Sequence, residues 1–100
     1  MTPDNTSSTS ESGLSFTAFV WSLASTAAIH MGDLAAPGEE GAGEVNIEGA
    51  RHMIEVLALL EQKTRGNLTA EERTVLEQVL YELRLRFVQV EQSQKRIIHP

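Results

Sequence analysis

Residues 14–32 read LSFTAFVWSLASTAAIHMG, a stretch without a single Asp, Glu, Lys or Arg. Helices on a protein surface normally carry a charged face. We therefore expect a helix over residues 15–31 that is hidden on most of its sides, in a core or against another molecule. Its apolar side chains recur at helical i, i+3, i+4, i+7 spacing and are Phe16, Phe19, Val20, Leu23, Ala27 and Met31.

The sequence also indicates where this helix begins and ends and how closely it can pack. Ser15 is a candidate N-cap, because its hydroxyl can accept a hydrogen bond from a first-turn N–H, and Gly32 suits the C′ position. We expect Ser and Thr hydroxyls within the helix to bond back to carbonyls one turn earlier. Small side chains let a second helix approach closely, and this stretch has many: Ala18, Ser22, Ala24, Ser25, Thr26, Ala27 and Ala28.

A membrane span is the first alternative for this stretch, because its length approaches the roughly 20 residues that a bilayer requires. Hydroxyl-bearing residues and His30 interrupt the run, however, and no basic residue precedes Arg51 to orient a span or to form a signal peptide. The chain also has no cysteine, which excludes disulfides and a thiol nucleophile. We therefore expect a cytoplasmic protein and disfavour contact with a membrane.

The charge is unevenly distributed along the chain, which has a net charge of −6. Residues 1–50 carry seven acidic and no basic residues, and residues 51–100 carry seven acidic and eight basic ones. Lys and Arg contacts to phosphates supply most non-specific affinity for nucleic acid. Because no basic stripe is present, nucleic acid is not an expected partner.

The pattern along the chain predicts one all-α domain. Residues 1–13 are rich in Ser and Thr and predict a disordered tail. Residues 14–92 predict a small three-helix arrangement, with helices over about 15–31, 47–65 and 70–91, and residues 93–100 predict a frayed tail. Between the first two helices, residues 33–45 are expected to form a flexible loop, because they contain Pro37, Gly38, Gly41 and Gly43.

The clearest local signal is GNLTAEE, residues 66–72. Gly66 suits the end of the second helix, and Thr69 with Glu72 forms the pattern of a capping box at the start of the third. The turn is short, so the second and third helices should form an antiparallel hairpin. Asn46 is the expected N-cap of the second helix. Two i,i+4 ion pairs are expected, Glu61 with Arg65 and Glu82 with Arg86.

Three stretches together resemble a bacterial family catalogued as domain-of-unknown-function family 1844. They are FVWSLASTAAIHMG, VNIEGARHMIEVLALLEQKTRGNLTAEE and VLYELRLRFV, and the resemblance covers about Phe16 to Val88. It implies a small, mostly helical cytoplasmic protein, with no known activity, cofactor or catalytic residue to carry over. Gly49 departs from the pattern, where a larger apolar residue is expected, and a glycine there weakens the helix by up to about 1 kcal/mol.

The sequence predicts no catalytic, cofactor-binding or metal-binding residues. His30 is interpreted as a cation or capping donor at a helix C-terminus, in preference to a ligand, because no partner lies at a defined spacing. His52 and Glu55 at i,i+3 form one pair, whereas metal-binding bundles need several acids on facing helices. The glycines of the loop lack the strand, helix and Lys of a phosphate-binding motif.

The leading functional hypothesis is a self-associating structural or interaction protein without catalytic activity, with a dimer as the first choice. The alternative is an adaptor that binds another protein or a membrane surface through the uncharged helix 14–32. Trp21 fits an interface anchor and a core residue equally well. The candidate interface consists of Phe19, Trp21, Ser22, Ser25 and Ile29.

Overall fold

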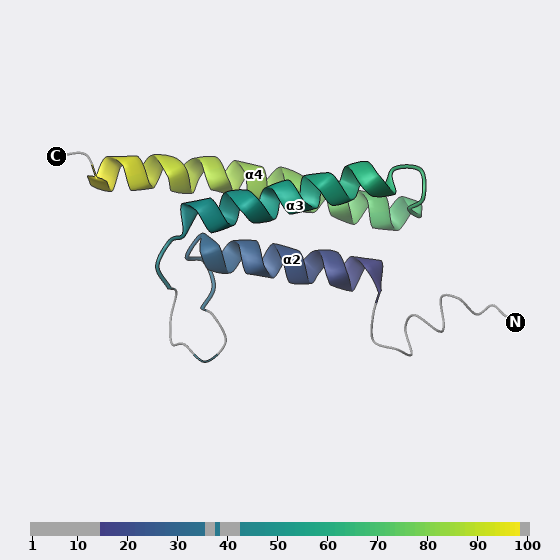
Figure 1. Cartoon of the computed structure of the whole chain (residues 1–100), viewed down its shortest axis with the longest axis horizontal. Helices are drawn as coiled ribbons and strands as arrows, with labels where there is room; N and C mark the ends of the chain where they lie inside the picture. The colour runs from purple at the N-terminus through teal and green to yellow at the C-terminus, as the bar shows by residue number, and fades with distance from the viewer. Residues whose placement is uncertain (1–14, 36–37, 39–42, 99–100) are drawn as a thin grey trace, which may run out of the picture.

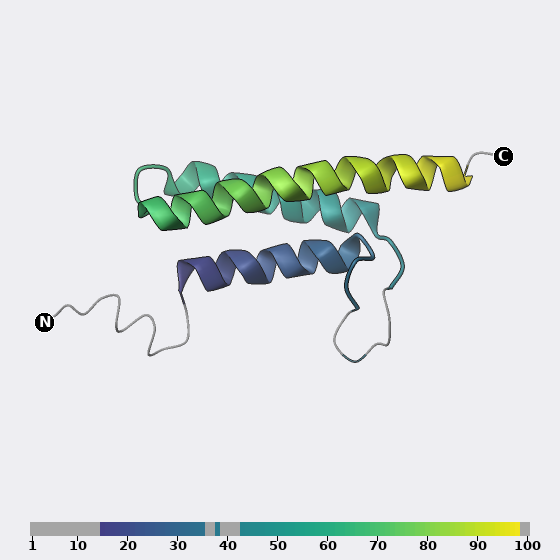
Figure 2. The ribbon, with the colours of Figure 1, turned by 180° about the vertical axis from the view of Figure 1, so that it is seen from behind.

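The computed structural model describes residues 15–35, 38 and 43–98. Three helices account for most of them: α2 (Phe16–His30), α3 (Ile47–Thr64) and α4 (Ala70–Ile98). Figures 1 and 2 show α3 and α4 side by side and running in opposite directions, with α2 packed along the pair and parallel to α4. The described residues contain no strand, so the predicted all-α fold class is confirmed.

The three predicted N-caps all form. The Ser15 hydroxyl accepts from the Ala18 N–H at 3.1 Å, and the Asn46 side chain accepts from the Gly49 N–H at 2.9 Å. At the start of α4 the capping box is reciprocal. The Glu72 N–H donates to Thr69 Oγ1 at 3.1 Å, and the Thr69 N–H donates to Glu72 Oε1 at 2.9 Å.

The C-terminus of α2 is a Schellman motif. Gly32 has φ +81°, the left-handed conformation that favours glycine at C′. The Asp33 N–H donates to the Ala28 carbonyl at 2.9 Å, and the Gly32 N–H donates to the Ile29 carbonyl at 3.0 Å. These bonds end α2 and turn the chain sharply into the following loop.

The core has two apolar clusters, and α2 contributes to both. One cluster joins Val20 and Ala24 to buried leucines and a valine of α3 and α4, and the other joins Ala27 and Met31 to Ala50 and Val90. Two of the four residues of this buried stripe are alanines, which let the helices approach closely. Phe19, predicted on this stripe, lies at its edge instead, and its side chain is 42% exposed.

Helix α4 extends seven residues past its predicted end at residue 91. Val90 is buried against Met31 and Ala50, so the core continues to this end of the bundle. The residues after Val90 include Gln and Lys, which are good helix formers, and no Gly or Pro lies between Val90 and Pro100. The tail predicted to fray from residue 93 is thus helical as far as Ile98, while the tail predicted over 1–13 lies outside the described residues.

None of the helices in the described part of the chain combines the length and apolar character required to cross a bilayer.

Candidate functional site

The candidate interface residues lie on one side of α2, which we call the α2 face: Phe19, Trp21, Ser22, Ser25 and Ile29. The Trp21 side chain is 54% exposed, Phe19, Ser22 and Ser25 are also exposed, and Ile29 is half-buried. The opposite side of α2 carries the buried stripe that ends at Met31. The fold of a single chain therefore leaves an uncharged helix surface in contact with water.

Hydroxyl groups on this side of α2 satisfy their hydrogen bonds within the helix. The Ser22 hydroxyl donates to the Phe19 carbonyl at 2.8 Å, and the Thr26 hydroxyl donates to the Ser22 carbonyl at 3.1 Å. These are the predicted bonds to the preceding turn. Because their donors are already satisfied, Ser22 and Thr26 can be covered by another molecule at little cost in lost hydrogen bonds.

An apolar groove of about 230 Å³ runs between α2 and α4, and we call it the α2/α4 groove. Small side chains from α2 line one part of it, and Glu82 is the only charged residue among the described residues that line it. Trp21 stands at its edge, and Leu34, which follows α2, is also exposed. Its lining residues are Trp21, Ala24, Ser25, Ala28, Leu34, Val79, Glu82 and Leu83.

A second apolar groove, of about 200 Å³, lies on the other side of α2, and we call it the α2/α3 groove. Lys63 is the only charged residue that the structure places in its lining within the described part of the chain, and Leu59 in its wall is 53% exposed. The α2 face is thus bordered on both sides by apolar surface. The residues that line this groove are Phe19, Leu23, Val56, Leu59, Leu60 and Lys63.

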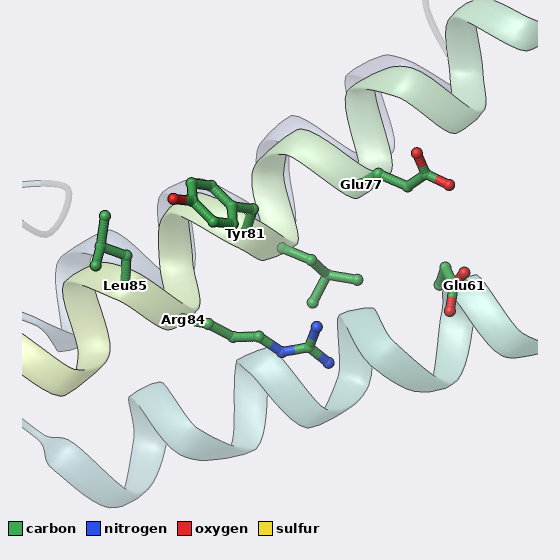
Figure 3. Close-up of a pocket in the computed structure, with 6 residues that line it drawn as sticks. Glu61, Glu77, Tyr81, Arg84 and Leu85 are labelled. Atoms are coloured by element: carbon green, nitrogen blue, oxygen red, sulfur yellow. The ribbon is translucent and has the colours of Figure 1, made fainter.

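The groove between α3 and α4 has a different character. It measures about 450 Å³ and combines Leu80, Tyr81 and Leu85 with three charged residues, Glu61, Glu77 and Arg84. In Figure 3 the Arg84 side chain extends across the groove toward α3, while Tyr81 and Leu85 stand on α4. Charges interspersed with apolar side chains let this surface face water, which distinguishes it from the two grooves beside α2.

In the part of the chain that the structure describes, the histidine and acidic side chains do not gather into a metal site. Within residues 15–35, 38 and 43–98, no group of three His, Asp or Glu residues is placed to hold a metal ion. His52 is exposed on α3. The ring of His30 instead lies against Gly49, where a Cβ atom would approach its Nδ1 to 2.8 Å and the Asn46 Nδ2 to 2.7 Å. Gly49 therefore makes room for both the His30 ring and the Asn46 side chain.

One ion pair joins the end of α2 to α4. Arg86 donates from Nε and Nη2 to the two carboxylate oxygens of Asp33, at 2.9 and 2.7 Å. These hydrogen bonds from Arg86 outweigh desolvation and lower the pKa of Asp33, and the same bonds raise the pKa of Arg86. The predicted Glu82–Arg86 pair is wrong because Arg86 turns to Asp33. Glu82 accepts instead from Gln78 at 3.2 Å, and it remains at the edge of the α2/α4 groove.

The sequence grouped the five residues of the α2 face, and its role as an interface stays a prediction. The sequence did not predict the apolar surface on either side of it. Leu34, Leu59 and Glu82 come from three different segments, and no local pattern links them to α2. The clearest missed signal is Leu34, an apolar residue directly after the glycine turn that ends α2.

A known protein family matches most of the chain. The model of the family described as "Domain of unknown function (DUF1844)" matches residues 13–89. This range includes α2, α3 and most of α4, and with them the α2 face and both of its grooves. No curated protein and no solved structure gives a match.

Proposed function

This chain belongs to the DUF1844 family, and from that premise we propose that it is a self-associating structural or interaction protein that pairs through the α2 face. The observation that carries the proposal is the exposed, uncharged surface of α2, with Trp21 and Phe19 at its two edges. Protein interfaces are depleted of charge at their centres and enriched in aromatic residues. The α2 face has both properties.

The physical driving force is the removal of apolar surface from water. Each Å² of apolar surface buried contributes about 25 cal/mol, before the cost of association is subtracted. Phe19, Trp21, Leu34 and Leu59 are exposed along or beside α2, so a partner that covers them gains from a contiguous area. Trp is also the residue type most often found at the energetic centre of an interface.

A second copy of the chain is the partner that best fits this surface. Two-fold dimers are the commonest oligomers, because a single self-complementary patch forms the whole interface. The small residues Ser22 and Ser25 at the centre of the α2 face allow two helices to approach closely. A catalytic role fits less well, since the described residues that line each groove beside α2 include a single charged one and thus no acid–base pair.

Sedimentation velocity of the wild type and two charge variants tests this function. The wild type should sediment as a dimer at roughly micromolar concentrations. Ser25→Arg should raise the dimer Kd by at least about a hundredfold, because an unpaired charge buried at an interface costs several kcal/mol. Gln62→Arg adds the same charge on an exposed part of α3 that lines neither groove, and it should leave the Kd within about twofold.

Two outcomes would oppose the proposal. A wild type that remains monomeric at high concentration would exclude self-association and favour the adaptor, whose partner is a different protein or a membrane surface. Equal effects of Ser25→Arg and Gln62→Arg would place the interface elsewhere. Circular dichroism of each variant establishes that a lost dimer does not reflect a lost fold.

A further inference from the structure

We propose that the two copies pair with their α2 helices antiparallel, and that each Trp21 lies in the α2/α4 groove of the partner subunit. Glu82 of the partner subunit accepts the hydrogen bond of the indole N–H. This inference rests on the proposed self-association, and it names the orientation, the register and the residues that hold the pair together.

The register follows from the residues opposite the buried stripe of α2. Ala18, Ser22 and Ser25 are exposed there, and Ile29 is half-buried. In an antiparallel two-fold pair, the two-fold axis passes one midpoint along α2. A residue on one side of this midpoint faces the partner's residue that lies equally far on its other side. The pairs Ala18 with Ile29 and Ser22 with Ser25 share one midpoint, between residues 23 and 24. The two small serines then lie at the centre, where the helices are closest.

This register places Trp21 opposite a space that can receive it. The two-fold axis sets each α4 beside the partner's α4, so the two α2/α4 grooves face each other. Trp21 then lies at the level of Ser25 and Ala28 of the partner subunit, which are small lining residues of that groove. A parallel pair would instead turn Trp21 toward Phe19 and Leu23 in the partner's α2/α3 groove, where larger side chains occupy the surface.

The polar atom of the indole also finds a partner in this arrangement. A buried Trp normally donates its N–H to an acceptor, and the α2/α4 groove has one charged acceptor, Glu82. The Glu82 carboxylate accepts from Gln78 through Oε2 at 3.2 Å. A carboxylate offers about four acceptor positions, so it can accept the indole N–H as well.

Charges on α3 support the antiparallel orientation. The exposed acid Glu55 lies near the middle of α3, and Lys63 lies near its end. Lys63 shares the α2/α3 groove with Phe19, and Glu55 lies about two turns away along α3. The antiparallel two-fold therefore brings Lys63 of each chain to the level of Glu55 of the partner subunit. Opposite charges at the same level favour this orientation.

Trp21 is the only tryptophan, so its fluorescence reports directly on the proposed contact. Over a dilution series of the full chain, the emission should shift to longer wavelength as the sedimenting dimer dissociates. Acrylamide quenching should increase over the same range. In the Ser25→Arg monomer, both should stay at their exposed values at every concentration.

Disulfide trapping tests the register, because the chain has no cysteine of its own. Mixed Ser22→Cys and Ser25→Cys chains should form the mixed disulfide faster than either homodimeric disulfide, since only residues 22 and 25 face each other within disulfide reach. The same mixture under denaturing conditions should show no such preference. Faster trapping of Ser22→Cys with itself would indicate parallel helices and overturn the inference.

Alanine substitution tests the acceptor. Glu82→Ala should raise the dimer Kd about tenfold, the loss expected for a hydrogen bond to a charged group. Glu77→Ala removes an exposed carboxylate from the α3/α4 groove and should change the Kd by less than about twofold. Equal effects of the two variants would exclude Glu82 as the acceptor.

The outcomes separate the two proposals. A wild type that dimerises while Trp21 keeps its exposed emission overturns the inference and leaves self-association standing. A wild type that never dimerises overturns both.

Discussion

The two junctions between helices are built in different ways. The α3–α4 junction is local: Gly66 ends α3 with φ +88°, and Thr69 and Glu72 cap α4 within one turn. The α2–α3 junction depends on contacts between segments distant in the chain. The Asn46 N–H donates to the His30 carbonyl at 2.6 Å, the His30 ring lies against Gly49, and Asp33 pairs with Arg86 of α4.

This difference matters for the proposed function because the α2–α3 junction determines the position of α2 on the α3–α4 hairpin. The contacts around His30 and Asp33 hold the C-terminal end of α2 against both other helices. They therefore help to determine that Ser22 and Ser25 point outward. A defect in the α3–α4 turn should weaken the fold without moving α2, whereas a defect at the α2–α3 junction should also displace the α2 face.

The largest effect is expected from Gly49→Leu, which fills the space that the His30 ring occupies. Overpacking at such a site costs up to about 3 kcal/mol. Urea unfolding at a fixed protein concentration should show this loss, and the dimer Kd should rise as α2 shifts. In a His30→Ala background the same substitution should cost less, although the added Cβ still meets the Asn46 side chain. An equal cost in both backgrounds would mean that His30 is not the obstacle.

A smaller effect is expected at the other junction from Gly66→Ala. No atom lies within 4 Å of a Cβ added at Gly66, so the cost comes only from its left-handed backbone, about 1–2 kcal/mol. Gly66→Asn should recover part of that loss, because Asn tolerates this conformation. Sedimentation should show an unchanged Kd for both variants. A weakened dimer would show that the α3–α4 turn also positions α2, which would break the distinction between the junctions.

The same distinction explains what could be predicted from the sequence. The caps at Ser15, Asn46 and Thr69 were predictable, because each depends on residues within one turn. The Glu61–Arg65 pair, observed at 2.9 Å, was predictable for the same reason. Arg86 was misassigned because a local carboxylate, Glu82, was the only partner that the sequence pattern could offer.

In the candidate site, too, local features could be predicted from the sequence and features that depend on tertiary packing could not. The absence of charge from residues 14–32 predicted that the α2 face needs a partner, and helical spacing placed Ser22 and Ser25 on it. Helical spacing alone could not place Phe19 at the edge of the buried stripe. The centre of the buried stripe lies where small residues let α3 and α4 approach α2 closely, and these residues are Ala24 and Ala27.

Removing the cap at the local junction should cost about 1 kcal/mol. Thr69→Ala deletes the hydroxyl that accepts from the Glu72 N–H, and N-cap removal has this typical magnitude. Thr69→Ser keeps the acceptor and should retain most of the stability in the same urea titration. If Thr69→Ala proved as stable as the wild type, the local description of this junction would be incorrect.

The smallest effect is expected from the Asp33–Arg86 pair, and its pH dependence identifies it. The pair is partly exposed, with 34% of the Asp33 side chain accessible, so a double-mutant cycle with Asp33→Asn and Arg86→Gln should give about 0.5–1 kcal/mol. Arg86 lowers the pKa of Asp33 in the folded state. The contribution should therefore be complete above the ordinary Asp pKa of about 3.9, and it should vanish as the pH falls through the lowered value. The Glu61–Arg65 pair within one helix is the matched control, and a cycle there should give about 0.3–0.5 kcal/mol. A coupling between Asp33 and Arg86 that persisted in strong acid would have to arise from packing, and Asp33 would then not anchor α2 through its charge.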